Sequence, residues 1–246
     1  MQARRVARGS FLSIALTVGK LGEPGVSSSV PPSRDSFALA LSALRSRLRQ
    51  AIDAPGAAIP INLIAQELRL SPTPVREALS RLAGEELVEK QGHAYTRPML
   101  DGAALAELYN LRWLYLARVG SSPAAKPGVG RFPHRPRLVF SSLLAQRPGE
   151  ARDVVDAMML DWILKADDLI LAQAFRRASE RLAPLQFAEA ELFGDPTTEA
   201  FDLARLYDVG PHAELRRALR SYHRRRMAAA PALVRIAASK YRPDIV

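Results

Sequence analysis

The sequence predicts a mainly α fold, in which a small winged helix-turn-helix with a two-stranded wing is followed by an all-α helical bundle. Apolar residues recur at three- and four-residue steps along most of the chain, which is typical of amphipathic helices. Residues 87–97 alternate around a glycine, as a hairpin does. We therefore expect a flexible tail at residues 1–34, a winged helix at residues 35–100 and a helical domain at residues 101–246.

Composition excludes several classes of protein. The chain has no cysteine, so disulfides, thiolate catalysis and thiolate metal sites are excluded. A net charge of +10 favours a polyanionic partner, of which nucleic acid is the usual one. No stretch reaches the ~20 apolar residues that span a bilayer. These features predict a cytoplasmic protein that does not enter a membrane.

Three helices are expected before the hairpin. Leu41, Leu44, Leu48 and Ile52 share one face of the first, Ser36–Ile52, and Asp35 is its predicted N-cap. The second covers Asn62–Leu70. The third follows the turn Ser71–Pro74, where proline costs no intrahelical bond, and extends to about Glu86.

The third helix and the hairpin carry the predicted DNA contacts. The N-terminal residues of a helix in the major groove meet the base edges, and a hairpin tip can enter the neighbouring minor groove. Amides and hydroxyls at the helix start suit a phosphate. The candidate DNA-binding residues are Ser71, Thr73, Arg76, Ser80, Arg81, Gly92 and His93. The same pattern also fits an ordinary three-helix core with surface arginines.

A family resemblance favours the DNA-binding interpretation. The run Ser71–Leu82 resembles the recognition helix of GntR-type regulators, and Ile64–Leu68 and Glu86–Val88 agree with its flanks. The resemblance implies a transcriptional regulator and not an enzyme, in this family more often a repressor. It also implies a homodimer that binds a palindromic site in double-stranded DNA. Members often have arginine where this chain has Pro72, so we expect a different base preference.

The second half should be helical apart from residues 120–149, which have no clear period. Asp101 is a plausible cap for a helix to Arg118, with Leu105, Leu108, Leu111 and Tyr115 inward. The remaining predicted helices are Ala151–Lys165, Asp168–Ala183, Leu185–Phe193, Thr197–Asp208, His212–Met227 and Pro231–Lys240.

The segment Leu105–Leu114, which contains Glu107–Arg112, resembles the opening helix of the FadR-like (FCD-type) effector domain. That resemblance implies control by a small effector, often a carboxylate, bound in the C-terminal domain. Many such domains hold a metal through one aspartate and three histidines. Here Asp156 and His223 alone match, so we expect neither metal nor cofactor, and these two residues are the effector-binding candidates.

Two other interpretations remain open. The C-terminal domain could serve only to dimerise, having lost ligand and metal sensing. An enzyme fused to a winged helix is the more remote alternative, because no nucleophile–base pair or cofactor loop accompanies the helices. The run Arg224–Arg226 suits DNA phosphate, a partner subunit or an anionic effector, and equally a solvated helix end.

Overall fold

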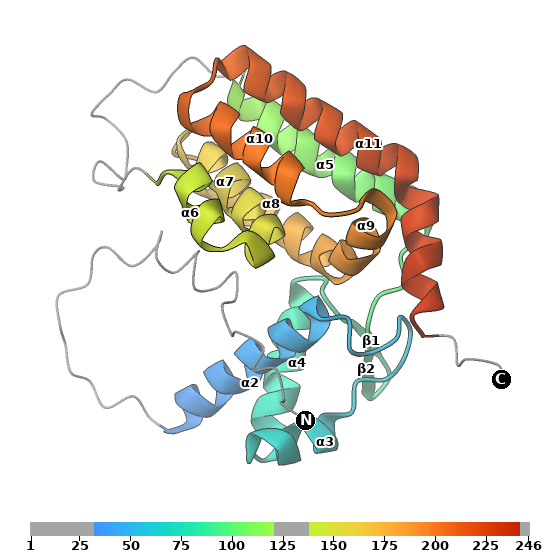
Figure 1. Cartoon of the computed structure of the whole chain (residues 1–246). Helices are drawn as coiled ribbons and strands as arrows, with labels where there is room; N and C mark the ends of the chain where they lie inside the picture. Colours follow the sequence, from blue (N-terminus) through green and yellow to red (C-terminus); the bar gives the residue numbers. More distant parts are fainter. Residues whose placement is uncertain (1–31, 121–137, 242–246) are drawn as a thin grey trace, which may run out of the picture.

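The computed structural model describes residues 32–120 and 138–241, which form a smaller winged-helix part and a larger helical part (Figure 1). Most of the expected tail (residues 1–31) and the segment 121–137 of the expected irregular stretch lie outside the described residues.

The winged-helix part follows the predicted order of elements. Helices α2 (Pro32–Arg49), α3 (Ile61–Leu68) and α4 (Pro72–Gly84) precede strands β1 (Glu89–Gln91) and β2 (Ala94–Thr96). Both α2 and α3 pack on α4. The core between them consists of apolar side chains at helical spacing, among them Ala40, Leu44, Ile64, Ala65, Val75, Ala78, Leu79 and Leu82. Burial of this stripe is what stabilises three helices that are too short to be stable alone.

The strands form an antiparallel hairpin in which Gln91 pairs with Ala94. The two-residue loop between them has a φ of +60° at Gly92, a conformation that a two-residue hairpin turn requires and that glycine adopts without strain. The extended segment before α3 adds to this sheet, since the Ile59 amide donates to the Tyr95 carbonyl at 2.8 Å. The predicted wing is therefore present and anchored.

The start and end of α2 differ from the prediction. Asp35 is not the N-cap, because α2 begins at Pro32 and Asp35 lies in its first turn. A carboxylate there still suits the positive end of the helix dipole. Ile52 does not join the apolar face and is 49% exposed, because α2 ends at Arg49 and Ala51 takes a φ of +50°.

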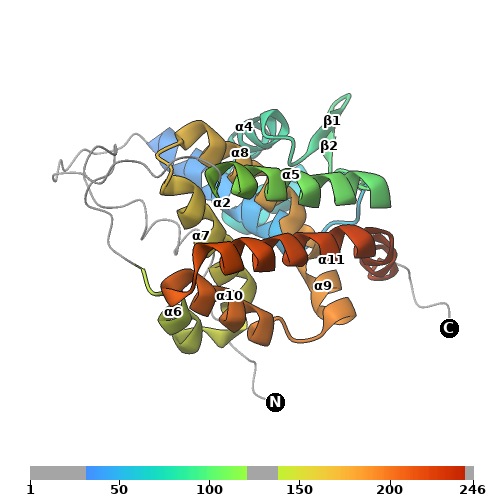
Figure 2. The same cartoon turned by 90° about the horizontal axis from the view of Figure 1, so that it is seen from above.

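The helical part consists of α5 (Gly102–Gly120), α6 (Phe140–Gln146), α7 (Ala151–Leu164), α8 (Leu169–Leu182), α9 (Gln186–Phe193), α10 (Thr197–Val209) and α11 (His212–Ser239). Almost every residue of α7 from Val154 to Ile163 is buried, so α7 is the central helix. Figure 2 shows α5 and α11 side by side along one face, and the two helices pack on each other. Within the described ranges, no helix combines the length and the apolar character that membrane crossing requires.

Asp101 and Asp168 cap α5 and α8 through hydrogen bonds from the amides of Ala104 (2.8 Å) and Leu171 (2.9 Å). Residues 120–149 were expected to be irregular, and the structure corrects this expectation. Helix α6 lies there, with only Phe140 and Leu144 buried, so it is too short to show a period in the sequence.

A second correction concerns the two helices expected on either side of Pro231, which are one helix, α11. Ala230, Leu233 and Ala237 continue its buried face against α5 across the proline. Figure 1 shows α11 changing direction in its C-terminal part, as expected where a proline removes a backbone bond. Gly102 allows this close packing, because a Cβ on it would lie 3.1 Å from Pro231.

A third correction concerns α5, whose inward face is rotated from the expected one. Leu111 is 37% exposed, whereas Arg112 is buried at 1% exposure beside Leu105, Leu108, Tyr109 and Leu116.

The two parts meet through ion pairs and through the end of α11. Arg45 of α2 pairs with Glu180 of α8, and Arg181 pairs with Glu86 at 2.9 Å. After α11, the Lys240 ammonium and the Tyr241 hydroxyl both donate to the backbone carbonyl of Ala51. These contacts hold the winged helix against the helical part.

Candidate nucleic-acid interface and effector site

The outer face of α4 is exposed and polar. Its members are the sequence candidates Ser71, Thr73, Arg76, Ser80 and Arg81, which are all exposed, while Val75, Ala78, Leu79 and Leu82 on the opposite side are fully buried. The buried side fixes the rotation of α4 about its own axis. The structure thus brings five of the seven predicted DNA-binding residues onto one accessible surface.

The start of α4 offers hydroxyls more than amides. The Ser71 side chain makes no capping hydrogen bond, so the capping considered from the sequence does not form there. Pro72 and Pro74 have no N–H, which removes two of the amide donors that a helix start normally presents. An anion at this end would therefore depend on the hydroxyls of Ser71 and Thr73.

The two arginines of the outer face differ in their freedom. The Arg81 Nε donates to Glu85 at 2.8 Å, and Glu85 is also held by Arg45. Arg76 has no hydrogen-bond or ion-pair partner within residues 32–120 and 138–241. An unpaired guanidinium on an exposed helix face suits the bidentate pattern of a guanine edge or a phosphate.

The wing completes this surface. Gly92 and His93 form its exposed tip, and Figure 2 shows the wing beside α4 at one end of the molecule. Sequence reasoning did not single out Arg69 and Lys90, which are both exposed. Arg69 has a φ of +56° in the turn between α3 and α4, and Lys90 lies on β1. The sequence feature that could have indicated them is that both are basic residues close to the recognition motif.

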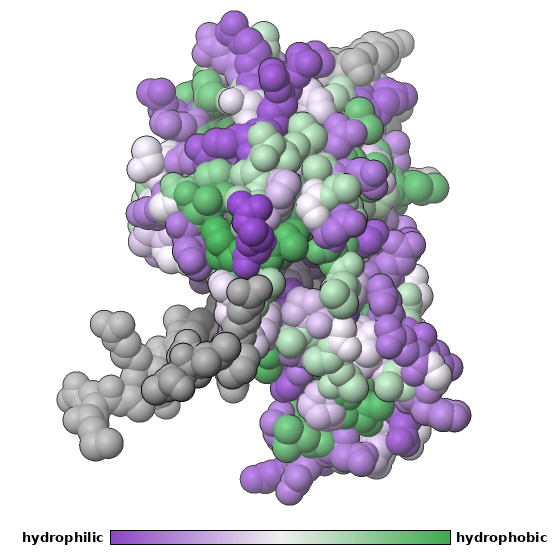
Figure 3. All heavy atoms as spheres, turned by 90° about the vertical axis from the view of Figure 1, so that its right-hand side faces the viewer, coloured by the Kyte–Doolittle hydropathy of each residue, from purple (hydrophilic) through white to green (hydrophobic). Residues whose placement is uncertain are grey.

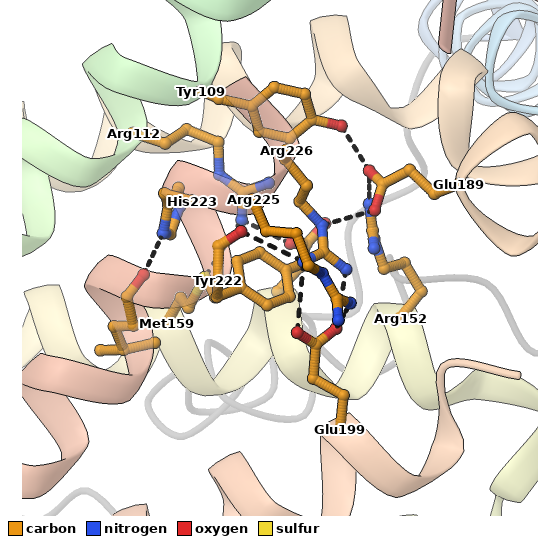
Figure 4. A network of polar contacts seen from close by, with 12 residues as sticks. Tyr109, Arg112, Arg152, Met159, Glu189, Glu199, Tyr222, His223, Arg225 and Arg226 are labelled. Atoms are coloured by element: carbon orange, nitrogen blue, oxygen red, sulfur yellow. Dashed lines mark hydrogen bonds and ion pairs between the residues drawn. The ribbon is translucent and has the colours of Figure 1, made fainter. Parts of the chain in front are cut away.

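The effector candidates Asp156 and His223 are both buried inside the helical part, and Figure 4 shows His223 together with Arg112. Asp156 accepts from the Arg112 guanidinium at 2.6 Å. The His223 Nδ1 lies 2.7 Å from the Leu219 carbonyl, so it is the protonated nitrogen of the ring. Burial and the charge of Arg112 lower the pKa of His223 well below its usual value, which keeps this histidine neutral.

A second cluster lies beside it. The Arg226 guanidinium, 1% exposed, donates to Glu189 at 2.5 Å and to Glu199 at 2.8 Å. Arg152 and the Tyr109 hydroxyl also contact Glu189. Burial raises the pKa of Tyr109 to about 12, so the phenol remains a hydrogen-bond donor.

We call these six charged residues the interior network: Arg112, Arg152, Arg226, Asp156, Glu189 and Glu199 (Figure 4). Three cations face three anions, so these six residues are together neutral, and the half-exposed Arg225 also pairs with Glu199 at 3.1 Å. Pairing of this kind is what allows charges to be buried at all. Within the part of the chain that the structure describes, no group of three or more His, Cys, Asp or Glu side chains is placed to hold a metal ion.

A cavity of about 400 Å³ borders this network, lined by Arg152, Phe193, Glu199, Arg225 and Arg226 among others. Neither Asp156 nor His223 lines it. The sequence analysis treated Arg226 as part of a surface run, but Leu215, Leu219, Tyr222, Arg226, Ala230 and Leu233 recur at three- and four-residue steps and are all buried. This helical spacing is the sequence feature that could have indicated that Arg226 points into the helical part.

Comparisons with known proteins agree with this geometry. Residues 40–95 match the family model described as bacterial regulatory proteins, gntR family. The fold is shared with a GntR transcriptional regulator from Rhodococcus sp. RHA1, with 18% identity over 80% of this chain and 98% of that one and a TM-score of 0.61. It is also shared with E. coli McbR/YncC, with 16% identity over 84% and 99% of the chains and a TM-score of 0.57. A search of curated proteins found no match.

The matched residues contain α3, α4 and the wing, which are the elements that present the outer face. The matched family is described as one of bacterial regulatory proteins. Residues 40–95 therefore match the gntR family model and fold as a winged helix.

Proposed function

We propose that the protein binds a palindromic operator in double-stranded DNA as a homodimer, in the cytoplasm, and represses transcription there. The observation that carries this proposal is the outer face of α4, an exposed polar surface with an unpaired arginine next to the wing. In a dimer, two copies of α4 would enter successive major grooves ~34 Å apart on one side of the duplex.

Each residue of the interface has a role in this proposal. Arg76 reads a base edge, because its side chain is long and exposed and no described residue competes for its guanidinium. Arg81 is held by Glu85 and contacts a base or phosphate from a more restricted position. Ser71 and Thr73 donate to a phosphate, with Ser80 at the edge of the contact. Gly92 allows close approach to the minor groove, where His93 donates.

Control by a small carboxylate effector is the second part of the proposal. The cavity of about 400 Å³ is supported as its site by the guanidinium groups of Arg225 and Arg226 in its wall. Asp156 and His223 would respond through Arg112, which donates to Asp156 and whose charge acts on His223. An effector that fits one arrangement of α9, α10 and α11 better than another would shift the dimer between binding and non-binding forms.

A second candidate is a dimeric regulator whose helical part senses no small molecule. The neutral interior network favours it, because Arg226 and Arg152 already have acidic partners and offer an incoming carboxylate no uncompensated charge. A panel of carboxylates and metals decides between the two by melting temperature. A shift that Arg226→Met abolishes supports effector control, whereas no shift from any member supports the second candidate.

The DNA-binding proposal is tested by selecting bound sequences from a random DNA pool at about 0.15 M salt, which weakens non-specific phosphate binding. We expect enrichment of one two-fold symmetric site, and loss of that enrichment with Arg76→Ala. Enrichment of an asymmetric site would contradict the dimeric arrangement. Failure of the folded protein to enrich any sequence would contradict the proposed function.

A further inference from the structure

A separate cavity of about 150 Å³ lies at the junction of the two parts, and we call it the junction cavity. Its walls come from α2, from the segment after β2, from the turn Ala183–Leu185 and from α11. Figure 3 shows apolar surface gathering on the helical part next to this junction. The apolar lining includes Leu48, Leu87, Leu100, Leu185, Val234 and Ala237.

Arg97 is the unusual member of the lining. It is only 6% exposed, and its Nη1 donates to two neutral acceptors, the Asp53 carbonyl at 2.9 Å and the Tyr241 hydroxyl at 2.7 Å. The Asp53 carboxylate is not available to it, because Arg47 binds both of its oxygens at 2.7 Å. Among residues 32–120 and 138–241, no carboxylate pairs with Arg97.

The other arginines of this cavity are paired. Arg45 is bound to Glu85 and Glu180, Arg49 to Asp153 and Arg181 to Glu86. Arg97 therefore differs from its neighbours, and a buried charge without a counter-ion is unfavourable. The junction cavity therefore contains one positive charge, that of Arg97, for which the described residues supply no counter-ion.

Lys240 adds a second positive group on the same side. Its ammonium donates to the backbone carbonyls of Gln50 and Ala51 at 3.2 Å and 2.9 Å. Burial, and after it the charge of Arg97, lower the pKa of Lys240. The two cations thus repel each other, and an anion paired with Arg97 would reduce that repulsion.

We propose that the junction cavity binds a small monocarboxylate with an apolar body about the size of benzene. A dry cavity of about 150 Å³ lined by aliphatic side chains is known to hold benzene, which sets the size of the body. The carboxylate pairs with the Arg97 guanidinium, and the body packs between the leucines of the two parts. This site is distinct from the larger cavity beside the interior network.

Binding here has a consequence for DNA recognition, and that consequence rests on the proposed function. The ligand would contact α2 and the segment after β2 on one side and α11 on the other. It would therefore favour one orientation of the winged helix on the helical part, and in a dimer the spacing of the two copies of α4 depends on that orientation.

The test uses the full chain and benzoate, with benzamide as a neutral molecule of the same shape. Isothermal titration calorimetry at pH 7 should show benzoate binding and at least about tenfold weaker binding of benzamide, since a charge-assisted hydrogen bond is lost. Arg97→Gln should weaken benzoate at least about tenfold, and Arg97→Lys should restore part of the affinity.

A second variant protects the test against misfolding of the Arg97 variants. Ala237→Leu fills the cavity without touching Arg97, and it should abolish benzoate binding while the circular dichroism spectrum stays that of the wild type. Equal affinity for benzoate and benzamide, unchanged affinity in Ala237→Leu, or no binding of benzoate at about 10 mM would overturn the proposal.

DNA affinity of each protein is measured separately, without benzoate, by fluorescence anisotropy on the selected operator. Operator binding without benzoate binding would leave the proposed function standing and reject the junction site. Benzoate binding without operator binding would do the reverse, so the two failures are distinguishable.

Discussion

The outer face of α4 and the interior network both depend on arginine, but in opposite states. Arg76 is exposed and has no partner in the described part of the chain, whereas Arg112 and Arg226 are about 1% exposed and each binds a carboxylate. An exposed guanidinium is hydrated, so it can remain unpaired and available to a polyanion. A buried one has to be paired, and pairing makes it structural. Arg97 combines the two states, because it is buried and has no acidic partner among the residues that the structure describes, and this is why we propose a ligand site there.

The largest effect should come from breaking the interior network. Arg226→Met leaves the buried Glu189 and the partly buried Glu199 with one cation fewer, so we expect a loss of about 3–5 kcal/mol of stability, measured by chemical unfolding. Arg225→Ala is the matched control, because Arg225 also pairs with Glu199 but is half-exposed, and it should cost less than about 1 kcal/mol. Equal losses in both variants would show that burial does not separate the two kinds of arginine.

Removing the exposed arginine should affect recognition and leave stability unchanged. Arg76→Ala should weaken operator binding by ~1–3 kcal/mol if it reads a base, with little loss on random DNA. Arg217→Ala, which removes the same charge from an exposed position on α11, should leave the operator preference intact. If Arg76→Ala weakens binding to operator and random DNA equally, Arg76 contacts a phosphate.

Asp153 lies between the two extremes, at the junction, where it pairs with Arg49 at 3.1 Å. Burial raises its pKa from 3.8 to about 6, against the opposing effect of Arg49. A carboxyl group with a raised pKa contributes stability that is fully present below pH 3.8 and is lost as the pH rises through about 6. In the wild type, this titration should lower the free energy of unfolding by about 1–2 kcal/mol between pH 4 and pH 7, and Asp153→Asn should remove that decrease.

The measurement for Asp153 is the free energy of unfolding as a function of pH for wild type, Asp153→Asn and the exposed control Asp202→Asn. The control should follow the wild-type curve. A difference between wild type and Asp153→Asn that stays constant from pH 4 to pH 7 would show that Asp153 does not titrate in this range.

The smallest expected effect concerns the wing. His93→Ala should weaken operator binding by about 0.5–1 kcal/mol, the net worth of one hydrogen bond, without changing the melting temperature. His212→Ala, at an exposed histidine at the start of α11, should not change operator affinity. Operator affinity unchanged in His93→Ala would remove this histidine from the interface.

Much of the fold could be predicted because its elements have strong local signals. Val75, Ala78, Leu79 and Leu82 show the helical period, and Gly92 marks the turn of the wing. Such signals need only a few neighbouring residues. The outer face of α4 follows from them directly, because assigning the buried side of a short helix also assigns the exposed one.

The errors occurred where tertiary contacts decide the outcome. Helix α11 continues through Pro231 because its flanking residues are held against α5. The interior network was missed because arginine was assumed to lie outward. In α5, Leu111 was expected to be buried and Arg112 was not considered, yet Arg112 finds a buried partner in Asp156, 44 residues away in the chain. Long-range pairing of this kind has no local signature.

Helix α11 also matters to anyone who wishes to build chimeric regulators. Helix α11 has 28 residues and belongs to the larger part. The two residues after it, Lys240 and Tyr241, both donate hydrogen bonds to the carbonyl of Ala51, which follows the end of α2. A fusion boundary placed after β2 would therefore separate the winged helix from Lys240 and Tyr241, whose hydrogen bonds hold it against the helical part. A chimera that joins this winged helix to another effector domain should therefore retain the last turn of α11 together with the winged helix.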